Sequence, residues 1–198
     1  KPSSAASDVY KRQIRNNMAV IKERAQGAAL YGVVSGQGGG VGAVRLARLL
    51  RDAGVTRFGV NSVEEAQLLR ESGFETEEIL MLRSTVDREE LERLVDLSVV
   101  CTVSSVDTGL ALNAVAENRS TVAEAHIQVD TGLGFGGFLI SEPEKILLAY
   151  RSLPNVALSG IYTQLHAVTG KSQMVRIDQS FPNRTIQELL LIETENKL

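Results

Sequence analysis

Cysteine is almost absent from this sequence: Cys101 is the single one among 198 residues, and tryptophan is missing altogether. One cysteine cannot form a disulfide within the chain, which excludes a small scaffold held together by disulfides. Cys101 lies in the apolar run 97–103, so we expect a buried thiol in the core rather than a reactive one.

The sequence also lacks long apolar runs, an excess of basic charge and any segment with the pattern of a signal peptide. No apolar stretch approaches the roughly 20 residues that a membrane helix requires. The net charge is −3 and no basic stripe is present, which disfavours a nucleic-acid-binding surface. We therefore expect a cytoplasmic protein that binds neither nucleic acid nor a membrane.

What is present suits a folded domain, since hydrophobic residues make up 43% of the sequence and charged residues 23%. Residues 1–13 differ from the rest because they are polar, rich in Ser and Ala, and without a period. They resemble either a disordered tail or the translation of a sequencing adapter. The predicted domain therefore comprises residues 14–198.

Helical and strand patterns alternate from Ile14 onward. The predicted strands are 29–34, 58–60, 79–82, 99–103, 125–129 and 156–162, and the predicted helices are 14–24, 42–53, 63–72, 88–95, 109–118, 142–151 and 185–192. Asp87 and Ser141 are predicted N-caps, and Gly54 and Gly73 are predicted glycines at helix C-termini. Short, Val/Ile-rich strands between helices predict a parallel α/β fold. Periodicity alone does not distinguish a closed (β/α)8 barrel from an open doubly wound sheet.

Two loops after predicted strands are rich in glycine. The first follows Val34 and opens a helix, which is typical of a flexible loop or of a phosphate cradle. It is not a dinucleotide fingerprint, since Val41 stands at the third glycine position, and it is not a P-loop. The second, Gly132-x-Gly134-x-x-Gly137, does not open the next predicted helix, which disfavours dinucleotide binding.

Other chemistry has little support in the sequence. The two histidines, His126 and His166, are predicted at opposite ends of the sheet, which disfavours a shared metal site. Ser35 lies outside a G-x-S-x-G turn and has no identifiable His–carboxylate pair, which disfavours a serine nucleophile. We predict no metal site.

Several motifs occur in a fixed order along residues 14–192 and together resemble the N-terminal domain of alanine racemases. They are Val33-Val34 with Gly40-Val-Gly-Ala-Val44, Arg57-Phe-Gly-Val-Asn-Ser-Val-Glu-Glu-Ala66, Val129-Asp-Thr-Gly-Leu-Gly134 and Gly160-Ile-Tyr-Thr163. The resemblance implies a (β/α)8 TIM-type barrel, here incomplete with about six strand–helix units, that binds pyridoxal phosphate. It also implies an amino acid as the small-molecule substrate and a homodimer in the full-length form.

The positions to which the resemblance assigns chemistry are mostly substituted in this chain. The family's imine-forming lysine corresponds to Ser35, its phosphate-contacting tyrosine to Gly39, its arginine near the cofactor's phenolic oxygen to Phe135, its cofactor-facing histidine to Gln164, and a lysine of many members to Gln128. Leu82 and Asp130 match the family at supporting positions. The resemblance thus implies a scaffold that keeps its packing residues and loses its reactive ones.

The change at Ser35 has the clearest chemical consequence. Pyridoxal phosphate needs an amine to hold it as an imine, and a hydroxyl forms no imine and is a far weaker base. Lys171, in the predicted loop after the sixth strand, is interpreted as a solvated lysine. We predict a catalytically inactive relative of amino-acid racemases, and a fragment of a longer chain. The alternative is a non-catalytic module that holds a small anion or nucleotide at its glycine-rich loops.

Overall fold

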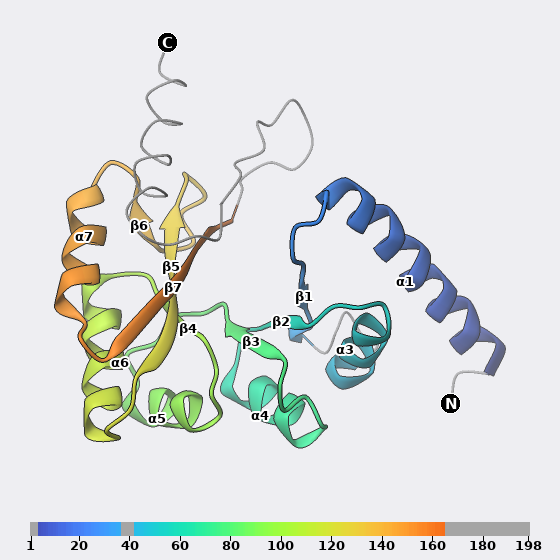
Figure 1. The fold of residues 1–198 in the computed structure, drawn as a ribbon, viewed down its shortest axis with the longest axis horizontal. Coiled ribbons are helices and arrows are strands. Elements are labelled where there is room, and N and C mark those ends of the chain that lie inside the picture. Colours follow the sequence, from blue (N-terminus) through green and yellow to red (C-terminus); the bar gives the residue numbers. More distant parts are fainter. Residues whose placement is uncertain (1–3, 37–41, 165–198) are drawn as a thin grey trace, which may run out of the picture. The chain divides into compact units, whose positions relative to one another are not determined.

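The computed structural model describes residues 4–36 and 42–164, in which helices and strands alternate (Figure 1). In chain order they are α1 (Ser4–Ala25), β1 (Tyr31–Val33), α3 (Ala43–Asp52), β2 (Arg57–Val60), α4 (Val63–Glu71), β3 (Glu78–Met81), α5 (Arg88–Asp96), β4 (Cys101–Val103), α6 (Val106–Asn118), β5 (Ala123–Asp130), β6 (Phe138–Leu139), α7 (Pro143–Ser152) and β7 (Val156–Thr163). The chain divides into a first unit, Lys1–Arg83, and a second unit, Ser84–Leu198.

The first unit contains a three-stranded parallel sheet in the order β1-β2-β3. Gly32 on β1 lies directly against α3, because a Cβ at this glycine would be only 2.7 Å from the Cδ1 atom of Leu50. On the next strand, Phe58 is fully buried and its ring meets the ring of Phe74 edge-on, with centroids 5.2 Å apart. Above Phe74 lies the guanidinium of Arg51, 4.4 Å from the ring centroid. These contacts fix the helices against the sheet.

Helix α1 begins at Ser4 rather than at the predicted start, Ile14. Residues 4–13 contain no proline or glycine that would interrupt the helix, and their small and polar residues continue it. The described side chains in that stretch are exposed, whereas Met18 is buried and Ile14 half-buried. The helix therefore packs through its second half.

The second unit contains a four-stranded parallel sheet in which β5 pairs with β4, β6 and β7. The β5–β7 ladder is interrupted between Ala125 and His126, where β7 has one extra residue. Helix α6 lies close to the sheet at Gly109, since a Cβ there would be 2.7 Å from Leu153 and 3.3 Å from Val103. That close approach explains a glycine inside a helix, a position at which glycine is otherwise unfavourable.

The helix ends confirm most of the predicted signals. Asp87 is the N-cap of α5 and accepts the N–H of Glu90, and Gly54 and Gly73 have φ values of +83° and +88° after their helices. The prediction for Ser141 is wrong, because α7 starts at a proline and its N-cap is Glu142, which makes no side-chain capping bond. Proline at a first helical position has no N–H to be capped.

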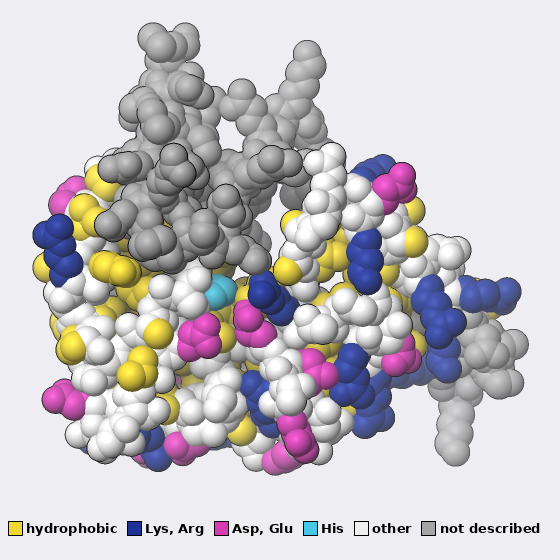
Figure 2. Space-filling view, viewed as in Figure 1, with side chains coloured by type: hydrophobic (Ala, Val, Ile, Leu, Met, Phe, Trp, Pro, Cys, Tyr) yellow, Lys and Arg dark blue, Asp and Glu magenta, His cyan; other side chains and the backbone are white. Residues whose placement is uncertain are grey.

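The predicted parallel α/β fold with alternating strand–helix units is confirmed. Within residues 4–36 and 42–164 the strands form two sheets and do not close into a barrel, and the predicted helix at 185–192 lies outside the described residues. Basic and acidic side chains are mixed across the face shown in Figure 2. No described helix has the length and apolar character needed to cross a membrane.

Candidate functional site

The candidate site residues of the first unit lie where its strands end. The backbone ladder continues past β1 and β3, since the N–H of Val34 donates to Gly59 and the N–H of Leu82 donates to Val60. Ser35 follows directly and is half-buried. A Cβ on Gly59 would lie 3.0 Å from Leu82 and 3.2 Å from Val33, so this glycine lets both apolar side chains approach β2. Ser35 and Leu82 thus share the carboxyl edge of one sheet, with β2 between their strands.

A carboxylate that the sequence analysis did not assign joins two of these loops. In the first turn of α4, Glu65 accepts the N–H of Gly36 at one oxygen and the N–H of Asn61 at the other, both at 2.8 Å. Its own N–H donates to Ser62 at 3.2 Å. The pattern Ser-x-x-Glu predicts a capping box at a helix start. It gives no sign that the glutamate also reaches the loop after β1.

The remaining first-unit prediction, Gly39, lies outside the described residues, as do Lys171 and His166. Three lysines belong to the described part of the chain: Lys11 and Lys22 on α1, and Lys145 on α7. Lys22 donates to the carbonyl of Ala53, and Lys145 pairs with Glu142 at 2.8 Å. Among residues 4–36 and 42–164, therefore, no lysine lies in a loop that follows a strand.

In the second unit the loop after β5 is organised by the side chain of Asp130. Its carboxylate accepts the N–H of Gly134 at 3.1 Å with both oxygens and the N–H of Gly132 at 2.8 Å. The backbone donors of Gly134, Gly132 and Leu133 lower the pKa of Asp130. The glycine-rich loop therefore directs its N–H groups toward the chain's own carboxylate.

The variant Asp130→Asn tests this loop through its pH dependence. We expect the variant to unfold at a lower urea concentration than the parent at pH 7. The difference between the two urea midpoints should be smaller at pH 3. Because the pKa of Asp130 is lower in the folded state, its ionised form contributes stability above the unfolded pKa of about 3.9. That contribution is lost as the pH falls through the lower folded pKa. Urea midpoints for both proteins provide the measurement, and an equal gap at both pH values would contradict the assignment.

The same loop does not have the geometry of a dinucleotide-binding turn. Gly137 has a φ of +117° and packs on the β5 backbone, where a Cβ would lie 2.8 Å from the nitrogen of Asp130 and 2.9 Å from the carbonyl oxygen of Gln128. The short strand β6 follows, and α7 starts only at Pro143. The third glycine thus seats the loop on β5 instead of opening a helix.

Phe135 and Gln164, the two remaining predicted positions, lie in neighbouring loops. Phe135 is 71% exposed, and Gln164 is exposed just after β7. The loops are joined by Thr131, whose hydroxyl lies 2.9 Å from the hydroxyl of Thr163 and 3.5 Å from the carbonyl oxygen of Gln164. The ends of β5 and β7 are therefore tied together by hydroxyl groups.

One face of the second sheet is polar, which the sequence analysis did not predict. The Thr102 and Tyr162 hydroxyls lie 2.9 Å apart, and burial raises the pKa of Tyr162. His126 lies over Gly160, where a Cβ would be 2.6 Å from its Nε2 atom. Gln128, paired in register with Tyr162, is buried. His126 lies within β5, which begins at Ala123.

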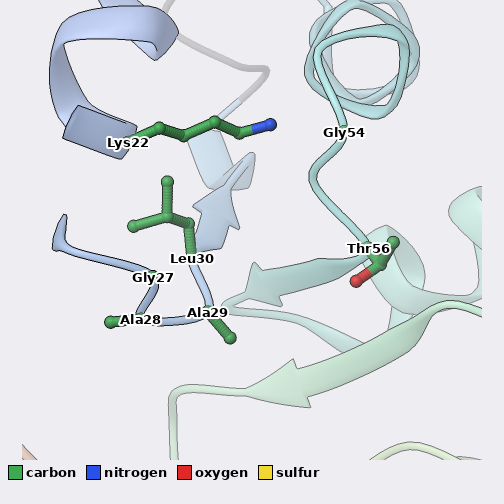
Figure 3. Close-up of a pocket in the computed structure, with 7 residues that line it drawn as sticks. All are labelled: Lys22, Gly27, Ala28, Ala29, Leu30, Gly54 and Thr56. Carbon is green, nitrogen blue, oxygen red and sulfur yellow. The ribbon is translucent and has the colours of Figure 1, made fainter.

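The cavity described next lies away from the candidate site loops, and the described residues contain no cluster of metal ligands. A cavity of about 280 Å³ opens beside Lys22, Leu30 and Thr56, near the residues that lead into β1 and β2 (Figure 3). It lies at the opposite end of these strands from Ser35. Figure 3 shows Lys22 extending toward Gly54, next to the carbonyl that its ammonium contacts at the end of α3, a favourable place for a cation. No group of three or more potential metal ligands occurs in the described part of the chain.

Comparison with known proteins identifies the family. The model of the alanine racemase N-terminal domain matches residues 9–189. The alanine racemase of Desulforamulus reducens is 29% identical over 188 residues, which cover 94% of this chain and 49% of that protein. The alanine racemase of Clostridium tetani is 34% identical over 149 residues, or 74% of this chain and 38% of that protein. The chain thus spans about half the length, or less, of the curated relatives that it matches.

Solved structures agree with this fold. Alanine racemase of Clostridium difficile 630 in complex with cycloserine matches with a TM-score of 0.70 and 27% identity, covering 79% of this chain and 42% of that one. Histidine racemase of Leuconostoc mesenteroides matches with a TM-score of 0.75 and 21% identity, covering 93% and 46%; at that identity it shows the fold alone. This chain therefore belongs to the alanine racemase N-terminal domain family.

Proposed function

We propose that this chain is the N-terminal part of an alanine-racemase-type protein that has lost its imine-forming chemistry. Ser35 carries the proposal, because it stands at the end of β1, where the resemblance assigns the lysine. The repeated strand–helix units support an incomplete (β/α)8 barrel. Intact relatives would take an amino acid as substrate and act as homodimers. Because a histidine racemase shares the fold, the fold does not identify the amino acid.

The family uses pyridoxal phosphate, and the residues present here do not fit its covalent attachment. A hydroxyl at position 35 cannot condense with an aldehyde to an imine. Lys22 and Lys145, by contrast, are amines, but both are engaged away from the loops that follow the strands. Phe135 offers an apolar ring where the family has a guanidinium. Among the described residues, therefore, no side chain is placed to hold this cofactor as an imine.

The alternative function, a module that holds an anion or nucleotide at its glycine-rich loops, has weaker support. In the loop after β5, the N–H groups of Gly132 and Gly134 already donate to Asp130. In the loop after β1, Gly36 donates to Glu65. An anionic ligand that used these described N–H groups would have to displace a carboxylate, which adds electrostatic repulsion and costs a hydrogen bond.

The variant Ser35→Lys tests the proposed loss. We expect the parent protein mixed with pyridoxal phosphate to show no protein-bound imine absorption. The variant should form an imine that borohydride reduces to a secondary amine on residue 35, detectable by peptide mass. Ser72→Lys is the matched control because Ser72 is the C-cap of α4, at the other end of that helix from the site. Equal labelling of both variants would indicate a non-specific surface reaction and contradict the proposal.

A fuller reconstruction decides whether the scaffold is that of a racemase. Ser35→Lys, Gly39→Tyr, Phe135→Arg and Gln164→His would be combined, and the chain joined to the C-terminal half of the Desulforamulus reducens relative. We expect cofactor binding, followed by measurable loss of optical activity from an alanine solution. Failure of this protein to form any imine, while the unmodified relative does so under the same conditions, would overturn the proposal.

A further inference from the structure

The geometry points to Glu65 as a positioning residue that fixes the turn containing residue 35 at the end of β1. This inference rests on the proposed function, since it concerns how the scaffold would present a reactive group at that position. The residue lies in the first turn of α4, far along the sequence from Ser35, and contacts the turn through the next residue, Gly36.

Two independent loops converge on the one carboxylate. Gly36, in the left-handed region at a φ of +63°, donates its N–H to Oε1, and Asn61 donates its N–H to Oε2, each at 2.8 Å. Both bonds are short for N–H donors, as expected when the acceptor is charged. The carboxylate thereby joins the ends of β1 and β2 through their backbones, whichever side chain occupies position 35.

Helix α4 fixes the backbone of Glu65. Ser62 accepts the N–H of Glu65 at 3.2 Å, and the residues on either side of this turn, Val63 and Ala66, are fully buried. The backbone of Glu65 is therefore fixed by packing, so its side chain needs little further ordering to bridge the two loops. A preorganised contact of this kind holds a functional group more precisely than a mobile loop does.

Only a carboxylate of this length serves both donors. Glutamine at position 65 has one acceptor oxygen, and its NH2 group would face the second N–H. Aspartate is one methylene shorter and would leave at least one donor unsatisfied. We therefore expect Glu65→Gln to disorder the loops at Gly36 and Asn61, and Glu65→Ala to disorder them more. The rest of the unit should keep its structure in both variants.

Amide hydrogen exchange measured by NMR on the parent chain provides the first test. In Glu65→Ala, the amides of Gly36 and Asn61 should exchange about tenfold faster or more, since hydrogen bonds to charged groups are the stronger ones. The amide of buried Leu69, in the same helix, should exchange as in the parent. Glu64→Ala is the matched control, because it removes an acidic residue from the same helical turn. Equal effects of the two variants at Gly36 would overturn the inference.

The second test asks whether the positioning matters for chemistry. In the Ser35→Lys background, Glu65→Ala should weaken imine formation with pyridoxal phosphate about tenfold, Glu65→Gln should weaken it less, and Glu64→Ala should leave it unchanged. If the double variant with Ser35→Lys and Glu65→Ala formed the imine as well as Ser35→Lys alone, the positioning role would be overturned. Absence of any imine in Ser35→Lys itself would count against the proposed function, while hydrogen exchange still decides the role of Glu65.

Discussion

Replacing Gly137 with alanine is expected to destabilise the second unit by about 4 kcal/mol or more, an exceptional effect for one methyl group. The φ of +117° is a conformation that residues with a Cβ rarely adopt. The added Cβ would also lie within 2.9 Å of three backbone atoms of β5, those of Gln128, Val129 and Asp130. A sheet backbone cannot move aside cheaply, so the loop must detach or the strand must distort.

Gly132→Ala separates the two causes of this effect. Gly132 has a φ of +111°, close to that of Gly137, but nothing lies within 4 Å of the position of its Cβ. Its replacement therefore costs only the backbone strain, about 1–3 kcal/mol. Urea unfolding followed by circular dichroism gives both values. A cost for Gly137→Ala that is no greater than that for Gly132→Ala would show that the contact with β5 is not tight.

Phe74→Ala is expected to destabilise the first unit by about 3–5 kcal/mol. The ring of Phe74 is fully buried, lies edge-on to Phe58 at 83° and carries the guanidinium of Arg51 on its face. Its removal leaves a cavity and ends both contacts, and aromatic pairs contribute about 0.5–1.5 kcal/mol beyond their buried area. Arg51 would retain its bonds to Gly73 and Glu77, so the loss is one of packing.

The control for this prediction is the same substitution on the surface. Phe135→Ala removes a ring that is 71% exposed, and we expect a change within about 0.5 kcal/mol. In thermal or urea unfolding, the loss of stability caused by Phe74→Ala should thus be several times that caused by Phe135→Ala. A similar small cost for both would mean that Phe74 lies in a part of the core that readily collapses around the missing ring.

Periodicity and turn residues predicted the alternation of strands and helices because each strand is a short apolar run between helix signals. Boundaries were predicted less well where packing overrides propensity. Gly109 was expected to open a helix, yet α6 starts at Val106, capped by Ser105 with a reciprocal bond from Thr108. Strand β6 has only two residues, too few to show the alternation of polar and apolar residues that predicts a strand. Its pairing with β5 depends on the fold of the whole loop.

The sequence positions of the candidate site stay a prediction, and the contacts around them could not be predicted from the sequence. Resemblance identified Ser35 and Phe135, and the structure places both after strands. The bridging role of Glu65 could not be predicted, because it joins residues 29 positions apart. Likewise, the contact between Thr102 and Tyr162 spans 60 positions and crosses β5. Single-sequence patterns report neighbours along the chain, whereas these contacts arise only once the strands are side by side.

The internal hydrogen bonds of Asp130 have an evolutionary consequence. Since its carboxylate satisfies the N–H groups of Gly132 and Gly134 from within the chain, the loop keeps its shape with no ligand present. Selection for folding alone would retain Asp130 and the glycines, and would leave exposed positions such as Phe135 and Gln164 free to drift. In such a lineage, catalysis can be lost first and the scaffold much later.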